Sequence, residues 1–170
     1  RPIHDDGEYA RNPGELCCAV AAGMGGHNAG EVARAMAGRV REEGVRAPRS
    51  PTEEALRRAV GRANEQIWRA SKEREGCAGM GTTITALCME GNIAHIAQVG
   101  DSRAYLIRNR AILQVTTDHT LVEEMVLSGL ITPSEALSHP KRNYITRPLG
   151  TAETAEVDPL RPATPPDAGL

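Results

Sequence analysis

Two stretches near the start of the chain carry residues that suit metal or ligand binding. Positions 4–8 read His-Asp-Asp-Gly-Glu, and carboxylate oxygens are the ligands that hard cations prefer. The same run also fits a solvated, charged loop. Four glycines between positions 23 and 30 follow the apolar run at 16–20. Glycine allows a positive φ and a close approach to a ligand, or a tight connection into a helix, and both interpretations are open from these residues.

Asp101 is a further candidate for chemistry. It follows Gly100 at the end of the apolar run 93–99, with Ser102 and Arg103 next to it. An acidic turn after a buried strand can ligate a cation. Its carboxylate can equally accept backbone N–H groups and pair with Arg103. The residues leave both roles open.

Hydrophobic periodicity predicts the elements that position these candidates. Apolar residues at 32, 36 and 40 predict an amphipathic helix over 30–45, and Ser-Pro-Thr-Glu at 50–53 is a capping box that predicts a helix over 51–74. The β-branched run 79–89 and the run 93–99 predict an antiparallel hairpin. Further runs at 104–108 and 111–115 extend it to a four-stranded meander, which two short helices follow, the second ending near Ser138.

Composition limits the class of protein. A chain of 170 residues fits one domain, and 20 basic against 22 acidic residues give no electrostatic basis for binding nucleic acid or an anionic membrane. No apolar run is long enough for a membrane span and no signal segment opens the chain, so we expect a cytoplasmic location. The cysteines, at 17, 18, 77 and 88, lack C-x-x-C spacing and are predicted to be buried free thiols. The chain starts without Met and stops in an apparent turn, as a fragment does.

Six ordered motifs resemble those of the bacterial metal-dependent Ser/Thr protein phosphatases of type 2C. They are Ala-Gly-Met-Gly-Gly-His at 22–27, Gly-Met-Gly-Thr-Thr at 79–83, Val-Gly-Asp-Ser-Arg at 99–103, Asp-His-Thr-Leu-Val at 118–122, Gly-Leu-Ile-Thr-Pro at 129–133 and His-Pro at 139–140. The resemblance implies an α+β fold, a four-layer α/β/β/α sandwich of two antiparallel sheets flanked by helices, incomplete at both chain ends. It also implies a single domain over 1–170 with a flap-like insertion at 116–147.

The resemblance implies a site as well. In the family two Mn²⁺ or Mg²⁺ ions, with a third in bacterial members, activate the water that hydrolyses phosphoserine and phosphothreonine in proteins. By the motifs, Asp6 is the first metal-binding carboxylate and the catalytic residue, and Arg1 is the phosphate-binding guanidinium. Gly23 supplies a carbonyl to the metal, and Asp101 matches a ligand of the third metal. Phosphorylated proteins, and a Ser/Thr kinase or its substrates, are the implied partners of a monomeric enzyme.

The chain departs from the family pattern at the metal ligands. Ala22 stands where the family has its bridging aspartate, and a methyl group cannot ligate a cation. His4 and Asp5 replace the family's Asn and Glu, and the sequence ends before the family's Ser-Asp-Gly-Leu and Asp-Asn segments. We therefore expect weak metal binding and impaired or absent hydrolysis.

An alternative function from another class is a pseudophosphatase or regulatory module that binds phosphoproteins without catalysis. A nucleotide-binding protein is disfavoured, because residues 23–28 do not read G-x-G-x-x-G and the elements do not form a βαβ unit.

Overall fold

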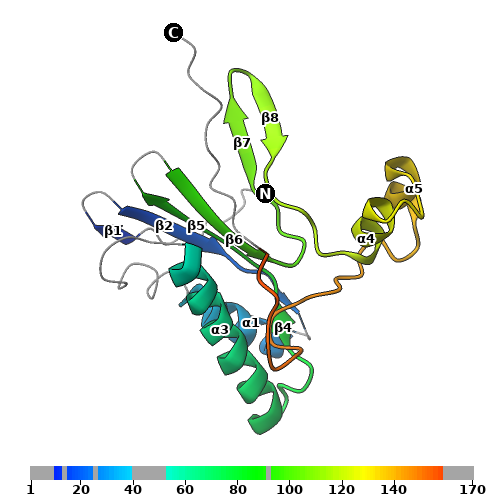
Figure 1. Ribbon diagram of the computed structural model, residues 1–170. Helices are drawn as coiled ribbons and strands as arrows, with labels where there is room; N and C mark the ends of the chain where they lie inside the picture. The colour runs from blue at the N-terminus through cyan, green and yellow to red at the C-terminus, as the bar shows by residue number, and fades with distance from the viewer. Residues whose placement is uncertain (1–9, 13–14, 25–26, 40–52, 91–92, 159–170) are drawn as a thin grey trace.

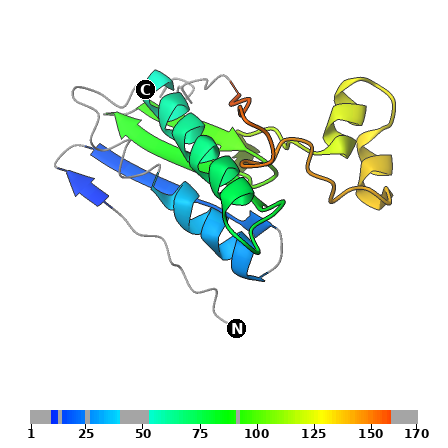
Figure 2. The ribbon, with the colours of Figure 1, turned by 90° about the horizontal axis from the view of Figure 1, so that it is seen from below.

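The computed structural model describes residues 10–12, 15–24, 27–39, 53–90 and 93–158. Its centre is a four-stranded antiparallel sheet, and two helices cover one face of that sheet (Figures 1 and 2). The strands, in sheet order, are β1 (Ala10–Asn12), β2 (Glu15–Val20), β5 (Ile84–Glu90) and β6 (Ile93–Val99), and the helices are α1 (His27–Gly38) and α3 (Glu53–Glu73). The strand before the glycines and the hairpin of β5 and β6 are confirmed.

The core lies between the two helices and the sheet. The predicted apolar face of α3 is buried, with Leu56, Val60 and Ile67 at most 1% exposed. The prediction for α1 was wrong in its start, because the helix begins at His27. Val32 and Met36 of the predicted face pack against the core as partly buried side chains, and Ala33 and Ala37 beside them are fully buried. Small residues face inward because α1 packs directly on the neighbouring backbone. Positions 40–45 of the predicted helix lie outside the described residues.

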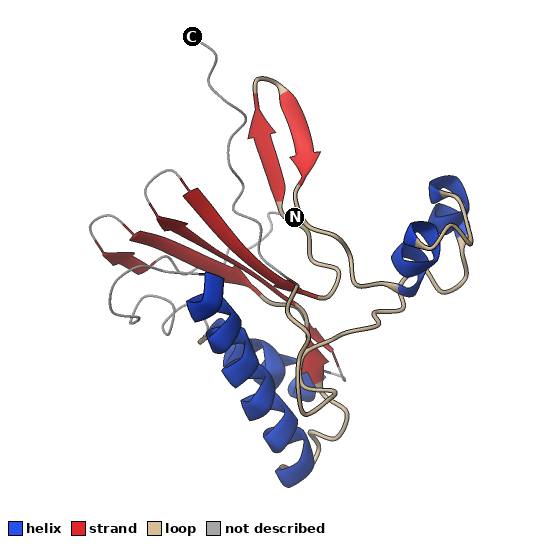
Figure 3. Ribbon diagram, viewed as in Figure 1, coloured by secondary structure: helices blue, strands red, loops and turns tan. Residues whose placement is uncertain are grey.

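The four-stranded meander predicted for 79–115 was wrong in its second half. Among the described residues, strands β7 (Tyr105–Arg108) and β8 (Ala111–Gln114) pair only with each other and form a separate two-stranded sheet (Figure 3). Positive φ angles at Asn109 and Arg110 close this hairpin, as a type I′ turn requires. The chain leaves the first sheet because Gly100, with φ +106°, turns the backbone after β6.

Two small units complete the described fold. Short strands β3 (Gly23–Met24) and β4 (Gly81–Thr82) pair at the end of the sheet, and Thr82 exchanges backbone hydrogen bonds with Leu149. Helices α4 (Leu121–Leu127) and α5 (Pro133–Ser138) lie apart from the sheet in both ribbon views (Figures 1 and 2). Thr132 and Glu135 form a capping box at the start of α5, as the sequence predicts.

Antiparallel sheets combined with helices make this an α+β fold, as predicted. Within the described residues, no helix is both long and apolar enough to cross a membrane.

The prediction of four free thiols was wrong for one pair. Cys17 and Cys88 form a disulfide, whereas Cys18 and Cys77 are free. Strands β2 and β5 place Cys17 directly opposite Cys88, with 4.2 Å between their Cα atoms. The two residues are 71 positions apart in sequence, so only the strand register brings them together.

The disulfide predicts a defined pattern of alkylation. When the chain is unfolded without reductant, iodoacetamide should label two cysteines, and it should label all four after reduction. Because the bridge spans 71 residues, reduction should lower the free energy of unfolding by up to about 4 kcal/mol through the entropy of the unfolded chain. Mass spectrometry and urea titration measure both effects, and four labels without reductant would contradict the bridge.

The packing of Gly150 on α3 gives a second prediction. Gly150 has φ +82°, and a Cβ there would lie 2.1 Å from Cγ2 of Ile67. Gly79 has φ +70° but a Cβ there would meet nothing within 4 Å, which makes it a matched control. We expect Gly79→Ala to cost about 1 kcal/mol of backbone strain and Gly150→Ala about 1–3 kcal/mol more. Urea unfolding measures both free energies of unfolding. Equal losses in the two variants would show that Ile67 moves aside without an energetic cost.

Candidate active site

The first part of the candidate site is the connection from β2 into β3. Ala21 and Ala22 make this connection, and the carbonyl oxygen of Ala22 accepts a hydrogen bond of 3.0 Å from the N–H of Thr83. The next residue, Gly23, lies opposite Thr82 in the β3–β4 ladder. The backbone at position 22 is therefore fixed against the start of β5, while its methyl group is exposed.

Gly23 is required by packing against its own helix. A Cβ at this position would lie 1.8 Å from the carbonyl oxygen of Gly30 in α1, and the φ angle of Gly23 is not positive. Close packing on Gly30, rather than a positive φ, is therefore what requires glycine at this position. Positions 25 and 26 lie outside the described residues.

The second part of the site is the turn from Gly100 to Arg103. A Cβ at Gly100 would lie 2.5 Å from Cγ2 of the buried Thr83, so the turn closes down on that side chain. Thr83 Oγ1 and Ser102 Oγ share a hydrogen bond of 2.8 Å, and Thr85 Oγ1 donates to the Ser102 carbonyl at 3.0 Å. Thr83 thereby contacts both the position of Ala22 and the turn that carries Asp101.

His119 holds the same turn from another side. His119 is 1% exposed, and its ring nitrogen Nδ1 accepts a hydrogen bond of 3.1 Å from the backbone N–H of Gly100. The backbone N–H of His119 donates to the Gly100 carbonyl oxygen at 2.9 Å. Because Nδ1 is an acceptor, the ring proton is on Nε2, which donates to Asp158 Oδ2 at 2.9 Å. His119 lies in the motif at 118–122, but sequence reasoning gave it no role, because its contacts are with two segments distant in sequence, at Gly100 and at Asp158.

Arg103 and Asp118 form a bidentate ion pair that fixes the end of the turn. Arg103 Nε lies 2.9 Å from both carboxylate oxygens and Nη2 lies 2.7 Å from Oδ2. The hydrogen bond to Asp118 raises the pKa of Arg103 above its ordinary value. The interpretation that Arg103 pairs with Asp101 was wrong, because the turn directs the guanidinium toward the buried Asp118.

Asp101 itself is half-buried, and its carboxylate has no hydrogen bond or ion pair with any other residue that the structure describes. The turn that presents it is held by Thr83, Ser102 and His119. A carboxylate that is fixed in place and uncommitted within the described part of the chain is available to an external ligand.

The predicted residues are only partly brought together. Ala22 and Gly23 lie on one side of Thr83 and the Asp101 turn on the other, whereas Asp6 and Arg1 lie outside the described residues. Over the described ranges, no three His, Cys, Asp or Glu side chains cluster in a way that could hold a metal ion. Mn²⁺ and Mg²⁺ require several oxygen ligands, so the described side chains alone do not fit a two-metal centre.

The contacts of Asp158 predict a pH dependence. Burial raises its pKa, but the hydrogen bond from His119 and the charge of Arg147, 3.0 Å away, outweigh burial and leave the pKa below its ordinary value. Asp158 therefore contributes stability above about pH 4, and that contribution is lost as pH falls through the lowered pKa.

We expect Asp158→Asn to destabilise the chain at pH 7 and to match the parent at pH values below the lowered pKa of Asp158. Glu156→Gln is the control. Glu156 also pairs with Arg147, but its side chain is 84% exposed and the distance is 3.6 Å, longer than the 3.0 Å between Arg147 and Asp158. Urea unfolding at several pH values measures the difference. A gap between parent and Asp158→Asn that is constant over pH would contradict the ionic role.

Comparisons with known proteins place this geometry in a family. A sequence model described as Protein phosphatase 2C matches residues 7–125. The serine/threonine phosphatase stp of Listeria welshimeri is 40% identical over 144 residues, which cover 82% of this chain and 57% of that protein. The chain thus spans little more than half the length of this relative.

Solved structures agree with the sequence relatives. The serine/threonine phosphatase Stp1 from Staphylococcus aureus superposes with a TM-score of 0.82 at 35% identity, over 93% of this chain and 65% of that one. The catalytic domain of the serine/threonine protein phosphatase PstP, in complex with two manganese ions, has a TM-score of 0.72 at 33% identity, over 92% and 65%. The matched motifs, the α+β fold and these relatives together show that the chain belongs to the protein phosphatase 2C family.

Proposed function

We propose that this sequence derives from an enzyme that removes phosphate from phosphoserine and phosphothreonine in proteins, and that the chain with Ala22 is impaired or inactive. Family membership supports the reaction class. The observation that carries the proposal is the uncommitted carboxylate of Asp101, in a turn locked by Thr83 and His119. The turn keeps these contacts in a chain that has Ala22 at the position where we propose that the parent enzyme has a metal-binding carboxylate.

The proposed roles follow the family motifs. Asp6 is the catalytic, metal-binding carboxylate and Arg1 binds phosphate, although neither lies among the described residues. Gly23 and Asp101 supply further metal ligands, and the ions are Mn²⁺ or Mg²⁺. Metal ions of this kind lower the pKa of bound water and neutralise charge on the phosphoryl group. Because Ala22 cannot ligate, no step through a metal is assigned to this chain.

A non-catalytic phosphoprotein-binding module is the second candidate, and Ala22 is the observation that favours it. We propose phosphorylated proteins, and a Ser/Thr kinase or its substrates, as partners of a monomer in the cytoplasm. The helical arm of α4 and α5, within the 116–147 segment, is proposed to act as the flap beside the bound substrate.

Restoring the carboxylate tests the proposal. The side chain of Ala22 is exposed, so Ala22→Asp adds a carboxylate without disturbing the hydrogen bond from Thr83. We expect Mn²⁺ to bind the Ala22→Asp chain at least tenfold more tightly in calorimetry, because a carboxylate is added next to the Asp101 turn. Ala35→Asp, at an exposed position of α1, adds the same charge elsewhere and serves as the control.

Hydrolysis of a phosphothreonine peptide, with EDTA as the blank, completes the experiment. The parent chain should stay at the EDTA level. Turnover by the parent that requires Mn²⁺ would contradict the proposed impairment. Equal Mn²⁺ affinity of the Ala22→Asp and Ala35→Asp chains would show that position 22 is no ligand position. Peptide binding without turnover in every variant would favour the non-catalytic module.

A further inference from the structure

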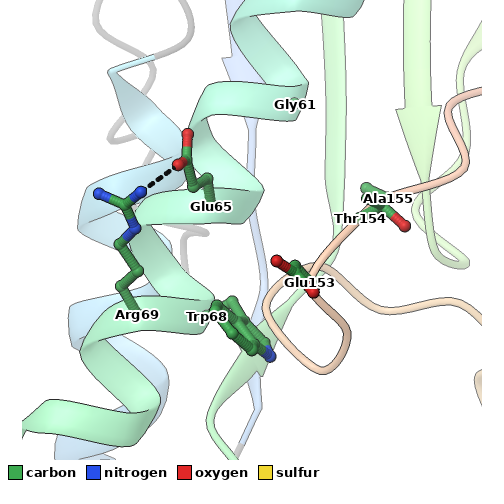
Figure 4. A pocket seen from close by; sticks show the side chains of 7 residues that line it. All are labelled: Gly61, Glu65, Trp68, Arg69, Glu153, Thr154 and Ala155. Carbon is green, nitrogen blue, oxygen red and sulfur yellow. Dashed lines mark hydrogen bonds and ion pairs between the residues drawn. The ribbon is translucent and has the colours of Figure 1, made fainter.

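A groove of about 430 Å³ lies between helix α3 and the segment that follows Gly150 (Figure 4). Gly61 and Trp68 line it from α3, and residues 153–155 line it from the opposite side. None of its lining residues belongs to the candidate active site. Its volume is within the range of sites that hold small molecules or short peptide segments.

Buried hydrogen bonds fix the width of this groove. Asn64, which is 1% exposed, donates from Nδ2 to the carbonyl oxygens of Ala152 at 3.1 Å and Glu153 at 3.0 Å. Its Oδ1 accepts the N–H of Gly150 at 2.8 Å. One side chain of α3 therefore holds the opposite wall at a set distance.

The floor of the groove is kept open by a glycine. Gly61 lies inside α3, where alanine favours a helix more strongly, and a Cβ at this position would meet nothing within 4 Å. Neither packing nor a positive φ requires glycine here. What the missing side chain provides is free space in the groove.

The wall opposite α3 is a segment outside the helices and strands, and its backbone groups at 154–157 have no partner in the described part of the chain. Ala155 and Val157 pack against the core, while Thr154 and Glu156 are exposed, which is the alternation of a β-strand. Backbone N–H and C=O groups without partners can form main-chain hydrogen bonds with a bound peptide.

The charges along the groove select a basic occupant. The carboxylate of Glu153 has no ion-pair partner among the described residues. The cations on the helix side are engaged, since Arg69 pairs with Glu65 (Figure 4). Lys72 Nζ lies 5.9 Å from the ring centroid of Trp68. Trp68 offers an aromatic wall for the aliphatic part of a long side chain.

We propose that this groove binds an extended segment of a basic polypeptide, with one Arg or Lys side chain over Gly61 between Trp68 and Glu153. The segment pairs with the backbone of residues 154–157. This binding is independent of the proposed phosphatase activity and needs no metal.

The sequence supplies its own probe, because Trp68 is the chain's one tryptophan. The test is a fluorescence titration of the whole chain with the capped heptapeptide Thr-Val-Thr-Arg-Thr-Val-Thr, with Glu in place of Arg as the control peptide. We expect a saturable change in Trp68 emission with the Arg peptide, weakened by salt, and at least tenfold weaker binding of the Glu peptide. Equal affinity for both, or no change up to millimolar peptide, would overturn the proposal.

Two variants locate the binding. Gly61→Leu fills the floor and should weaken binding at least tenfold, whereas Gln66→Leu, at an exposed position of the same helix outside the groove, should leave it unchanged. Glu153→Gln should weaken binding and reduce its salt dependence. If circular dichroism shows that Gly61→Leu is unfolded, the affinity of the Glu153→Gln chain is the deciding measurement. Parent-like affinity of a folded Gly61→Leu chain, or of Glu153→Gln, would show that the peptide binds elsewhere.

Discussion

The arrangement of the candidate site depends on the buried Thr83. Its N–H fixes the backbone at Ala22, its methyl group lies directly under Gly100, and its hydroxyl group shares a hydrogen bond with Ser102. A buried polar side chain is stable only when its hydrogen bonds are satisfied, so these contacts constrain one another. Two segments about 80 positions apart in sequence are thereby held on either side of one residue.

Because of these contacts, the geometry of the site does not depend on the side chains that would do its chemistry. The turn at Asp101 is also held by His119, which reaches Asp158 with its second ring nitrogen, and by the ion pair of Arg103 and Asp118. None of these contacts uses the side chain at position 22. The fold around the Asp101 turn therefore does not depend on which side chain stands at position 22, and function has to be argued from the site rather than from the fold.

Local signals in the sequence were sufficient for most of the elements. The capping box and the spacing of Leu56, Val60 and Ile67 placed α3, and the β-branched runs placed β5 and β6. The start of α1 and the attachment of β7 were predicted wrongly. In both cases a close approach of backbone to a distant segment decided the outcome, at Gly23 against Gly30 and at Gly100 against Thr83. Periodicity within one segment carries no information on such contacts.

The sequence by itself determined the motifs and their order, and through them the family, because residue identity and order are enough for these. Only the tertiary structure decided that Arg103 pairs with Asp118 rather than Asp101, that Cys17 meets Cys88, and that His119 holds the turn. These pairings depend on strand register and on the direction that each turn gives to a side chain. A shift of one residue in register would reverse the face of every side chain on a strand, so these partners exist only in the folded chain.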